Sequence, residues 1–334
     1  MLSVLLICAF ALSLCSCGQS QGEDGEISIV CTLFPQYDWV RNVVGDTEGV
    51  SLTLLIQNGT DPHSYQPTAA DILAISNCDA IVYLGGESDL WVQEALERAG
   101  DPDIIKIALT DIEGMTLREI SAASHSHGHE GHGDHSDHSD HSGHGHGTLD
   151  EHLWLSLRNA AVATAHIAER LCELDGANGE IYAANAEEYI ARLNSLDSDY
   201  RATVESASEA DRFALFADRF PFVYMMEDYG IEYSAAFEGC TADVDADFDT
   251  VIRLIEEAAE HDVRYIAVTE SSDGALARTV ADSGCDIEII TMNSLQSITR
   301  ERVKEGVTYL SVMEDNLISL AKILKLESSA EIGE

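Results

Sequence analysis

The chain has 334 residues, of which 45% are hydrophobic and 23% charged, enough for two globular domains with sizeable cores. Its formal net charge is -42, from 60 acidic and 18 basic residues. A chain this acidic repels phosphate backbones, which argues against a nucleic-acid partner, and the acidity in itself favours solubility.

An uncharged, apolar run fills residues 2–17 and ends at Cys15 and Cys17. It is too short to span a bilayer but fits the apolar region of a signal peptide. Small or apolar residues before a cysteine are typical of a bacterial lipobox. We therefore expect a lipoprotein signal peptide at residues 1–17, lipidation of Cys17, a tether at 18–26, and an exported protein anchored to the cell membrane. No Lys or Arg follows Met1, so the basic region of a signal peptide is missing and the true start stays open.

Short apolar runs alternate with helical segments from residue 27 onward. We expect strands at residues 27–33, 51–56, 79–84 and 103–109, and helices at 35–44, 68–76 and 89–98. Such alternation favours βα units around a mainly parallel sheet. It predicts an N-terminal βα domain over residues 27–175.

A low-complexity, histidine-rich insert occupies residues 121–147. We expect it to be disordered, because it has almost nothing apolar to bury. Its imidazoles would collect Zn²⁺ weakly and raise the zinc concentration near a tighter site; a tolerated loop without function is the alternative. The candidates for this accessory role are His125, His127, His129, His132, His135, His138, His141, His144 and His146.

A long helix is expected after a shorter one at residues 158–172. From Tyr182 to Val204, apolar residues recur at alternating four- and three-residue steps, which predicts one buried stripe along a connector helix at 176–207. A C-terminal βα domain over 208–334 would follow, with strands at 213–217, 231–237, 264–269 and 286–292 and helices at 219–229, 248–261, 274–283 and 301–326. The fold class is therefore α/β: two βα domains with mainly parallel sheets, joined by one long rigid connector helix, with a cleft between them.

The cysteines beyond the signal peptide form no CxxC zinc pattern. In an oxidising compartment some could pair, and the candidate pairs are Cys31 with Cys78 and Cys240 with Cys285. Buried free thiols are the alternative for these cysteines and for Cys172.

Four histidines lie outside the insert. His63 comes just after a predicted strand in a polar loop, and His152 directly precedes a helix. Ligands of open α/β sheets gather beyond the carboxyl ends of the strands, which makes these two the candidates for binding. His166 lies inside a predicted helix and His261 at a helix end, so we expect both to be structural.

Two acids occupy equivalent positions in the second domain. Asp218 follows the strand expected at 213–217, and Glu270 follows the strand expected at 264–269. Histidine nitrogens and carboxylate oxygens suit Zn²⁺ or Mn²⁺, and two of each would neutralise a divalent cation.

Several segments together resemble the ZnuA-type family, the solute receptors of zinc and manganese ABC transporters. The connector helix and the position of the histidine-rich insert match, as do residues 58–67 (NGTDPHSYQP), 152–157 (HLWLSL), 213–230, and 268–270 ahead of a helix. The resemblance covers nearly everything from residue 27 to the C-terminus.

The resemblance implies a metal site in the interdomain cleft, with His63 as the first ligand and His152 as the second. The family's third ligand, a His or Glu, stands at the start of the helix that ends in a Tyr-Gly or Phe-Gly pair. Counting back from that pair gives Arg219, which cannot bind a cation. We therefore assign the adjacent Asp218 as the substitute, with Arg219 pairing with it. Glu270 matches the fourth ligand, an acid after a strand.

The implied function is capture of Zn²⁺ by an extracytoplasmic monomer that delivers the ion to an ABC permease and its ATPase. Four protein ligands leave no position for an activated water, so no enzymatic activity is expected. A manganese or iron receptor of the same family is the alternative, since an acid at the third position favours harder metals. A secreted metallohydrolase would need an open site, and the sequence has no HExxH motif. A surface adhesin of the same fold also stays open.

Overall fold

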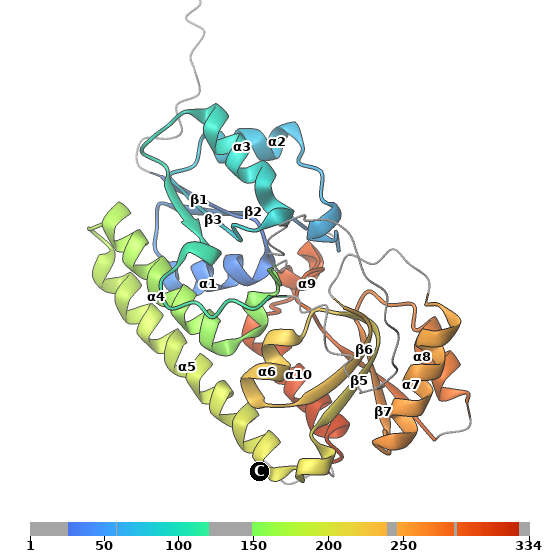
Figure 1. Ribbon diagram of the computed structural model, residues 1–334. Coiled ribbons are helices and arrows are strands. Elements are labelled where there is room, and N and C mark those ends of the chain that lie inside the picture. Colours follow the sequence, from blue (N-terminus) through green and yellow to red (C-terminus); the bar gives the residue numbers. More distant parts are fainter. Residues whose placement is uncertain (1–25, 58, 120–148, 239–245, 284–285, 327–334) are drawn as a thin grey trace, which may run out of the picture.

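The computed structural model describes residues 26–57, 59–119, 149–238, 246–283 and 286–326. Within these residues the chain forms two lobes, each built on a four-stranded parallel sheet (Figure 1). Cys17, the histidine-rich insert, Cys240 and Cys285 lie outside the described residues. No helix in the described ranges is long and apolar enough to cross a membrane.

The first lobe has the strand order β2-β1-β3-β4, and every strand pair is parallel. Helices α2 and α3 cover one face of the sheet, and α1 and α4 the other (Figure 1). Coverage on both faces explains why β3 is buried and apolar throughout. The elements are β1 (Ile27–Cys31), α1 (Phe34–Val44), β2 (Val50–Leu54), η1 (Pro62–Ser64), α2 (Ala69–Ser76), β3 (Ala80–Tyr83), η2 (Glu87–Asp89), α3 (Leu90–Ala99), β4 (Ile105–Ala108), η3 (Leu109–Asp111), η4 (Leu153–Leu155) and α4 (Leu157–Leu174), where η marks short 3₁₀ helices.

The second lobe repeats this plan with the order β6-β5-β7-β8, again all parallel. Strand order reverses beside β1 in the first lobe and beside β5 in the second, and ligands bind at such switch points in open α/β sheets. The elements are η5 (Glu209–Asp211), β5 (Phe213–Phe220), α6 (Val223–Tyr229), β6 (Glu232–Glu238), α7 (Phe248–Glu260), β7 (Tyr265–Thr269), α8 (Ala275–Ala281), β8 (Glu288–Met292), α9 (Arg300–Lys304) and α10 (Tyr309–Ile323).

Helix α5 (Gly179–Ser206) runs along both lobes (Figure 1). It packs against α1 and α4 of the first lobe and against α6 and α10 of the second. Its buried stripe is the one that the residue spacing predicts: Tyr182, Ala186, Tyr189, Leu193, Leu196, Tyr200 and Val204. The predicted fold class, two parallel-sheet α/β domains, is confirmed.

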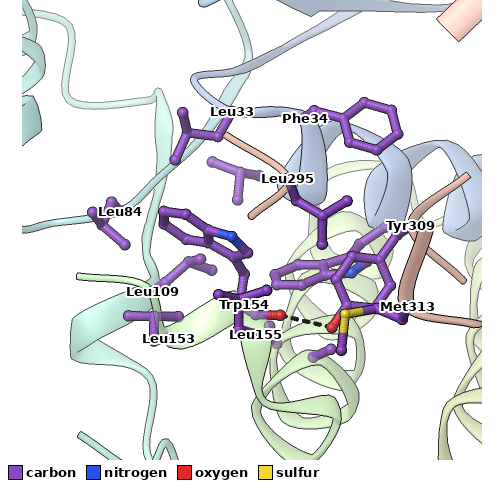
Figure 2. Packing of buried hydrophobic residues seen from close by; sticks show 14 of the residues in the cluster. Leu33, Phe34, Leu84, Leu109, Leu153, Trp154, Leu155, Leu295, Tyr309 and Met313 are labelled. Carbon is purple, nitrogen blue, oxygen red and sulfur yellow. Dashed lines mark hydrogen bonds between the residues drawn. The ribbon is translucent and has the colours of Figure 1, made fainter. Parts of the chain in front are cut away.

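A continuous hydrophobic cluster extends from the first lobe through α5 into the second lobe. Figure 2 shows Trp154, Leu295 and Tyr309 within it. Trp154 Nε1 donates to Ser294 O at 2.9 Å, and the Tyr309 hydroxyl donates to Trp154 O at 2.6 Å. Separating the lobes would expose this apolar surface and break these hydrogen bonds, so the junction holds the lobes at a defined separation.

Two predicted helix boundaries are wrong. Strand β5 continues to Phe220 and α6 begins only at Val223, because a residue before proline, here Phe220 before Pro221, disfavours helical backbone. The helix expected at residues 301–326 is divided into α9 and α10. Gly306 adopts a φ of 91° between them, and the Thr308 side chain caps α10.

Of the two alternatives for Cys31 and Cys78, a disulfide or buried free thiols, the structure has the second: both side chains are buried free thiols. In the parallel register Cys31 pairs with Val82, four positions beyond Cys78, so the two cysteines are not opposite each other in the sheet. Burial raises the pKa of the Cys31 thiol well above its usual range. Cys172 is likewise a free thiol.

Candidate metal centre

Two histidines from distant parts of the first lobe meet. The Nε2 atoms of His63 and His152 lie 3.4 Å apart, and their ring centroids are separated by 5.4 Å. Two nitrogens that each lie about 2.0–2.1 Å from a tetrahedral zinc ion are about 3.3–3.4 Å apart. The two rings therefore already have the separation needed to bind one ion.

An aspartate two residues earlier fixes the backbone of each histidine. Asp61 Oδ1 accepts a hydrogen bond from His63 N at 2.9 Å at the start of η1, and Asp150 Oδ1 accepts one from His152 N, also at 2.9 Å, just before η4. Aspartate commonly bonds to backbone two residues onward in this way, which produces tight local turns. The same Asp-x-His pattern thus positions both candidate ligands.

The second ring nitrogen of each histidine faces a carboxylate. His152 Nδ1 lies 2.9 Å from Asp150 Oδ1, and His63 Nδ1 lies 3.5 Å from Glu151 Oε2. Asp150, Glu151 and His152 are all buried. A carboxylate on the far side of a metal-binding imidazole fixes the ring orientation and makes the other nitrogen a better ligand. The arrangement leaves the two Nε2 atoms directed at a common point.

The loop after β3 shapes the space around Glu151. Ser88 N donates to Glu151 Oε1 at 3.1 Å, and a Cβ atom on Gly86 would overlap the same carboxylate, so a larger residue there would displace the Glu151 side chain. Asp89 lies next to this loop and accepts two backbone hydrogen bonds. Burial, reinforced by the negative charge of Glu151, raises the pKa of Asp89 to about 7.

Asp218 lies on β5, within the register shift between Phe216 and Arg219 in the pairing of this strand with β6. Its Oδ2 accepts hydrogen bonds from Thr269 N at 2.8 Å and Thr269 Oγ1 at 2.6 Å, and its Oδ1 accepts one from Arg219 N at 2.8 Å. The carboxylate therefore joins β5 to the end of β7.

Glu270 directly follows β7. One carboxylate oxygen accepts a hydrogen bond from Ser294 N at 2.8 Å, and the other accepts from Ser294 Oγ at 2.8 Å and Ser297 Oγ at 2.7 Å. In the part of the chain that the structure describes, no group of three or more His, Cys, Asp or Glu side chains is arranged to hold a metal ion. The structure brings His63 and His152 together and leaves the two second-lobe acids in their own hydrogen bonds.

Arg219 reaches from the second lobe to the first. Its Nη1 donates to Asp61 Oδ2 at 3.1 Å, so the aspartate that fixes His63 also carries an ion pair across the cleft. A cavity of about 40 Å³ lies here, lined by Asp61, Arg219, Thr269 and Glu270 among others. A larger surface hollow, about 820 Å³, lies beside Tyr265 at the start of β7 and contains none of the predicted site residues.

Asp61, Asp150 and Glu151, which position the two histidines, are not among the site residues predicted from the sequence. The signal was present in the sequence, because Asp61-Pro62-His63 and Asp150-Glu151-His152 repeat one pattern. The other two histidines in described positions have different surroundings. His166 lies 3.8 Å from Glu169 on α4, and His261 stacks on Phe213.

The chain matches the model of the ZnuA family, described as zinc-uptake complex component A, periplasmic, over residues 29–323, and it belongs to this family. It is 31% identical over 331 residues to the zinc-binding lipoprotein AdcA of Streptococcus pneumoniae, which covers 98% of this chain but only 62% of that relative's length. It is 30% identical over 332 residues to the high-affinity zinc uptake system protein ZnuA of Bacillus subtilis, covering 97% of this chain and 98% of that protein.

The fold is also similar to a solved structure. The crystal structure of the Zn(II)-bound ZnuA-like domain of Streptococcus pneumoniae AdcA gives a TM-score of 0.70 at 27% identity, covering 90% of this chain and 99% of that one. The family that the sequence motifs indicated is therefore confirmed.

Proposed function

We propose that this chain is an extracytoplasmic solute-binding protein that captures Zn²⁺ and delivers it to an ABC permease and its ATPase. The observation that carries the proposal is the 3.4 Å approach of His63 Nε2 to His152 Nε2, with a carboxylate behind each ring. Relatives named for zinc binding and zinc uptake support the choice of cargo.

The remaining ligands would come from Glu270 and Asp218 of the second lobe. Glu270 lines the small cavity with Asp61, whose carboxylate fixes His63. Both acids accept hydrogen bonds in the structure, so binding a metal would exchange those hydrogen bonds for coordination. This exchange also suggests how the ion leaves. If Glu270 and Asp218 stopped coordinating the ion and returned to their hydrogen bonds, zinc would be released while the lobes stay together.

Binding without catalysis follows from this ligand set, because four protein ligands leave no position for an activated water. Lipidation at Cys17 would hold the protein at the membrane, and the histidine-rich insert would collect zinc nearby. Both of these parts of the proposal rest on the sequence.

Competition between the full chain and a zinc chelator tests the proposal. His63→Ala and His152→Ala should each lower the affinity for the most tightly bound zinc ion at least about a hundredfold, since each removes a ligand. His166→Ala is the matched control, because His166 lies on α4 of the same lobe and contacts Glu169. Unchanged affinity in both site variants would refute the zinc site. Mn²⁺ that displaces Zn²⁺ at equal concentration would favour the manganese alternative.

A further inference from the structure

Tyr224 of α6 joins the two chain segments that flank the histidine-rich insert. Its hydroxyl donates to Asp150 O at 2.8 Å and accepts from Arg118 N at 3.1 Å. Asp150 N donates to Arg118 O at 2.8 Å, and Glu119 and Leu149 form an antiparallel bridge one position further out. A side chain of the second lobe therefore fastens the first lobe at the base of the insert.

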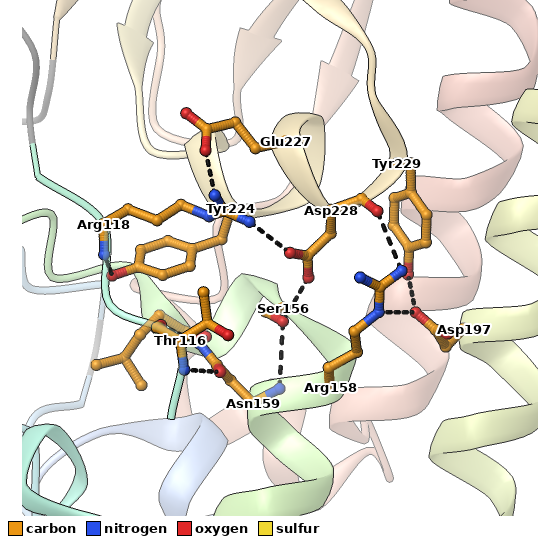
Figure 3. A network of polar contacts seen from close by, with 11 residues as sticks. Thr116, Arg118, Ser156, Arg158, Asn159, Asp197, Tyr224, Glu227, Asp228 and Tyr229 are labelled. Carbon is orange, nitrogen blue, oxygen red and sulfur yellow. Dashed lines mark hydrogen bonds and ion pairs between the residues drawn. The ribbon is translucent and has the colours of Figure 1, made fainter. Parts of the chain in front are cut away.

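Arg118 strengthens the same contact. Its guanidinium forms ion pairs with Glu227 and with Asp228 Oδ1, the latter at 2.7 Å, and lies 5.6 Å from the centre of the Tyr224 ring (Figure 3). Asp228 Oδ2 accepts a hydrogen bond from Ser156 Oγ at 2.5 Å. Helix α6 thus contacts the first lobe both before and after His152 in the sequence, at Asp150 and at Ser156.

Asp150 links this contact to the metal centre. Its backbone carbonyl is the acceptor for Tyr224, and its carboxylate lies 2.9 Å from His152 Nδ1. Tyr224 is fully buried and Asp150 is only 3% exposed, so water cannot readily replace either partner. The Tyr224 hydroxyl therefore contacts the backbone of the same residue whose carboxylate contacts the His152 ring.

We propose that Tyr224 is a positioning residue for His152 that acts through Asp150. The zinc affinity of the cleft then depends on a hydroxyl of the second lobe that does not touch the ion. This inference rests on the proposed zinc function. It couples the docking of α6 on the first lobe to the orientation of a metal ligand.

Tyr224→Phe removes the hydroxyl and keeps the ring. Tyr200→Phe is the matched control: Tyr200 is also fully buried, and its hydroxyl donates to a backbone carbonyl, Met313 O, at 2.6 Å. The full chain of each variant is titrated with Zn²⁺ in competition with a chelator, and its Tm is measured. Both variants should lose some thermal stability, but only Tyr224→Phe should weaken zinc binding, by about tenfold.

A double-mutant cycle separates positioning from general loosening of the fold. Asp150→Ala keeps the carbonyl that Tyr224 binds and removes the carboxylate behind His152. In that background, Tyr224→Phe should have no further effect on zinc affinity. The inference would be overturned if Tyr224→Phe bound zinc with wild-type affinity, or if Tyr200→Phe weakened zinc binding equally. It would also be overturned if Tyr224→Phe weakened zinc binding in the Asp150→Ala background by the same factor as in the wild type. His63→Ala in the same assay tests the function itself: if it binds zinc normally, the zinc site is wrong, whatever Tyr224 does.

Discussion

His63 and His152 are separated by 89 positions in the sequence, and their Nε2 atoms lie 3.4 Å apart. The chain brings them together because the segment after β2 and the segment before α4 meet near the carboxyl ends of the first lobe's strands. Each ring is held on its other side by Asp150 or Glu151. The pair therefore needs little rearrangement to bind a metal ion, which reduces the ordering cost of binding.

Gly86→Ala should weaken zinc binding about tenfold, since the added Cβ would push the Glu151 carboxylate away from His63. Gly176→Ala is the control, because a Cβ there meets only Cys172 O at 3.9 Å, an ordinary contact. Chelator competition measures both variants. Equal zinc affinity in the two would show that Glu151 has no part in orienting His63.

Glu270→Gln and Asp218→Asn should differ in their effect on zinc affinity. Glu270 lines the small cavity and accepts two hydrogen bonds from serine hydroxyls, which can rotate away, so its loss should weaken zinc binding at least about tenfold. Glu270 also accepts Ser294 N and Asp218 Oδ2 accepts Thr269 N, so both substitutions should lower the free energy of unfolding by about 1–3 kcal/mol. Zinc titration and urea unfolding measure the two effects. A larger loss of affinity in Asp218→Asn would make Asp218 the principal acidic ligand.

Tyr309→Phe should destabilise the junction between the lobes. The substitution leaves Trp154 O, which accepts the Tyr309 hydroxyl at 2.6 Å, without this buried donor, at a cost of about 1–3 kcal/mol. Urea unfolding of the full chain measures the change. An unchanged free energy of unfolding would mean that this hydrogen bond does not hold the lobes.

Asp89 should make stability depend on pH. Burial raises its pKa from 3.8 to about 7, so the folded chain keeps a proton that the unfolded chain has released across that window. The resulting stabilisation is complete at low pH and is lost as the pH rises through about 7. Asp89→Asn imitates the protonated form at every pH. The difference in free energy of unfolding between this variant and the wild type should therefore increase in favour of the variant by on the order of 2 kcal/mol from pH 5 to pH 8. Unfolding curves that differ by the same amount at both pH values would contradict this.

Local patterns in the sequence predicted much of the fold. The stripe from Tyr182 to Val204 is buried as its spacing requires, because helical periodicity alone decides which face of a long helix packs. The helix predicted from residue 68 is also present as α2, whose N-terminus is capped by Thr68 Oγ1, which accepts a hydrogen bond from Asp71 N. The predicted start of α6 at residue 219 was wrong, because Pro221 disfavours helical backbone at Phe220.

The site was only partly readable from the sequence. Loop position and residue type selected His63 and His152, and the structure brings them together. The role of Tyr224 had no local signal, since it depends on a contact between α6 and residues more than 70 positions earlier. Likewise, no sequence pattern shows that Arg219 forms an ion pair with Asp61, because that contact exists only once both lobes have folded.

We expect His63 and His152 to bind the same zinc ion. An anomalous difference map, recorded at the zinc absorption edge from crystals of the full chain grown with Zn²⁺, tests it most directly. We expect a peak about 2.0–2.1 Å from the Nε2 atoms of both histidines. A zinc peak that touches neither ring, with the Asp150 and Glu151 contacts unchanged, would contradict it.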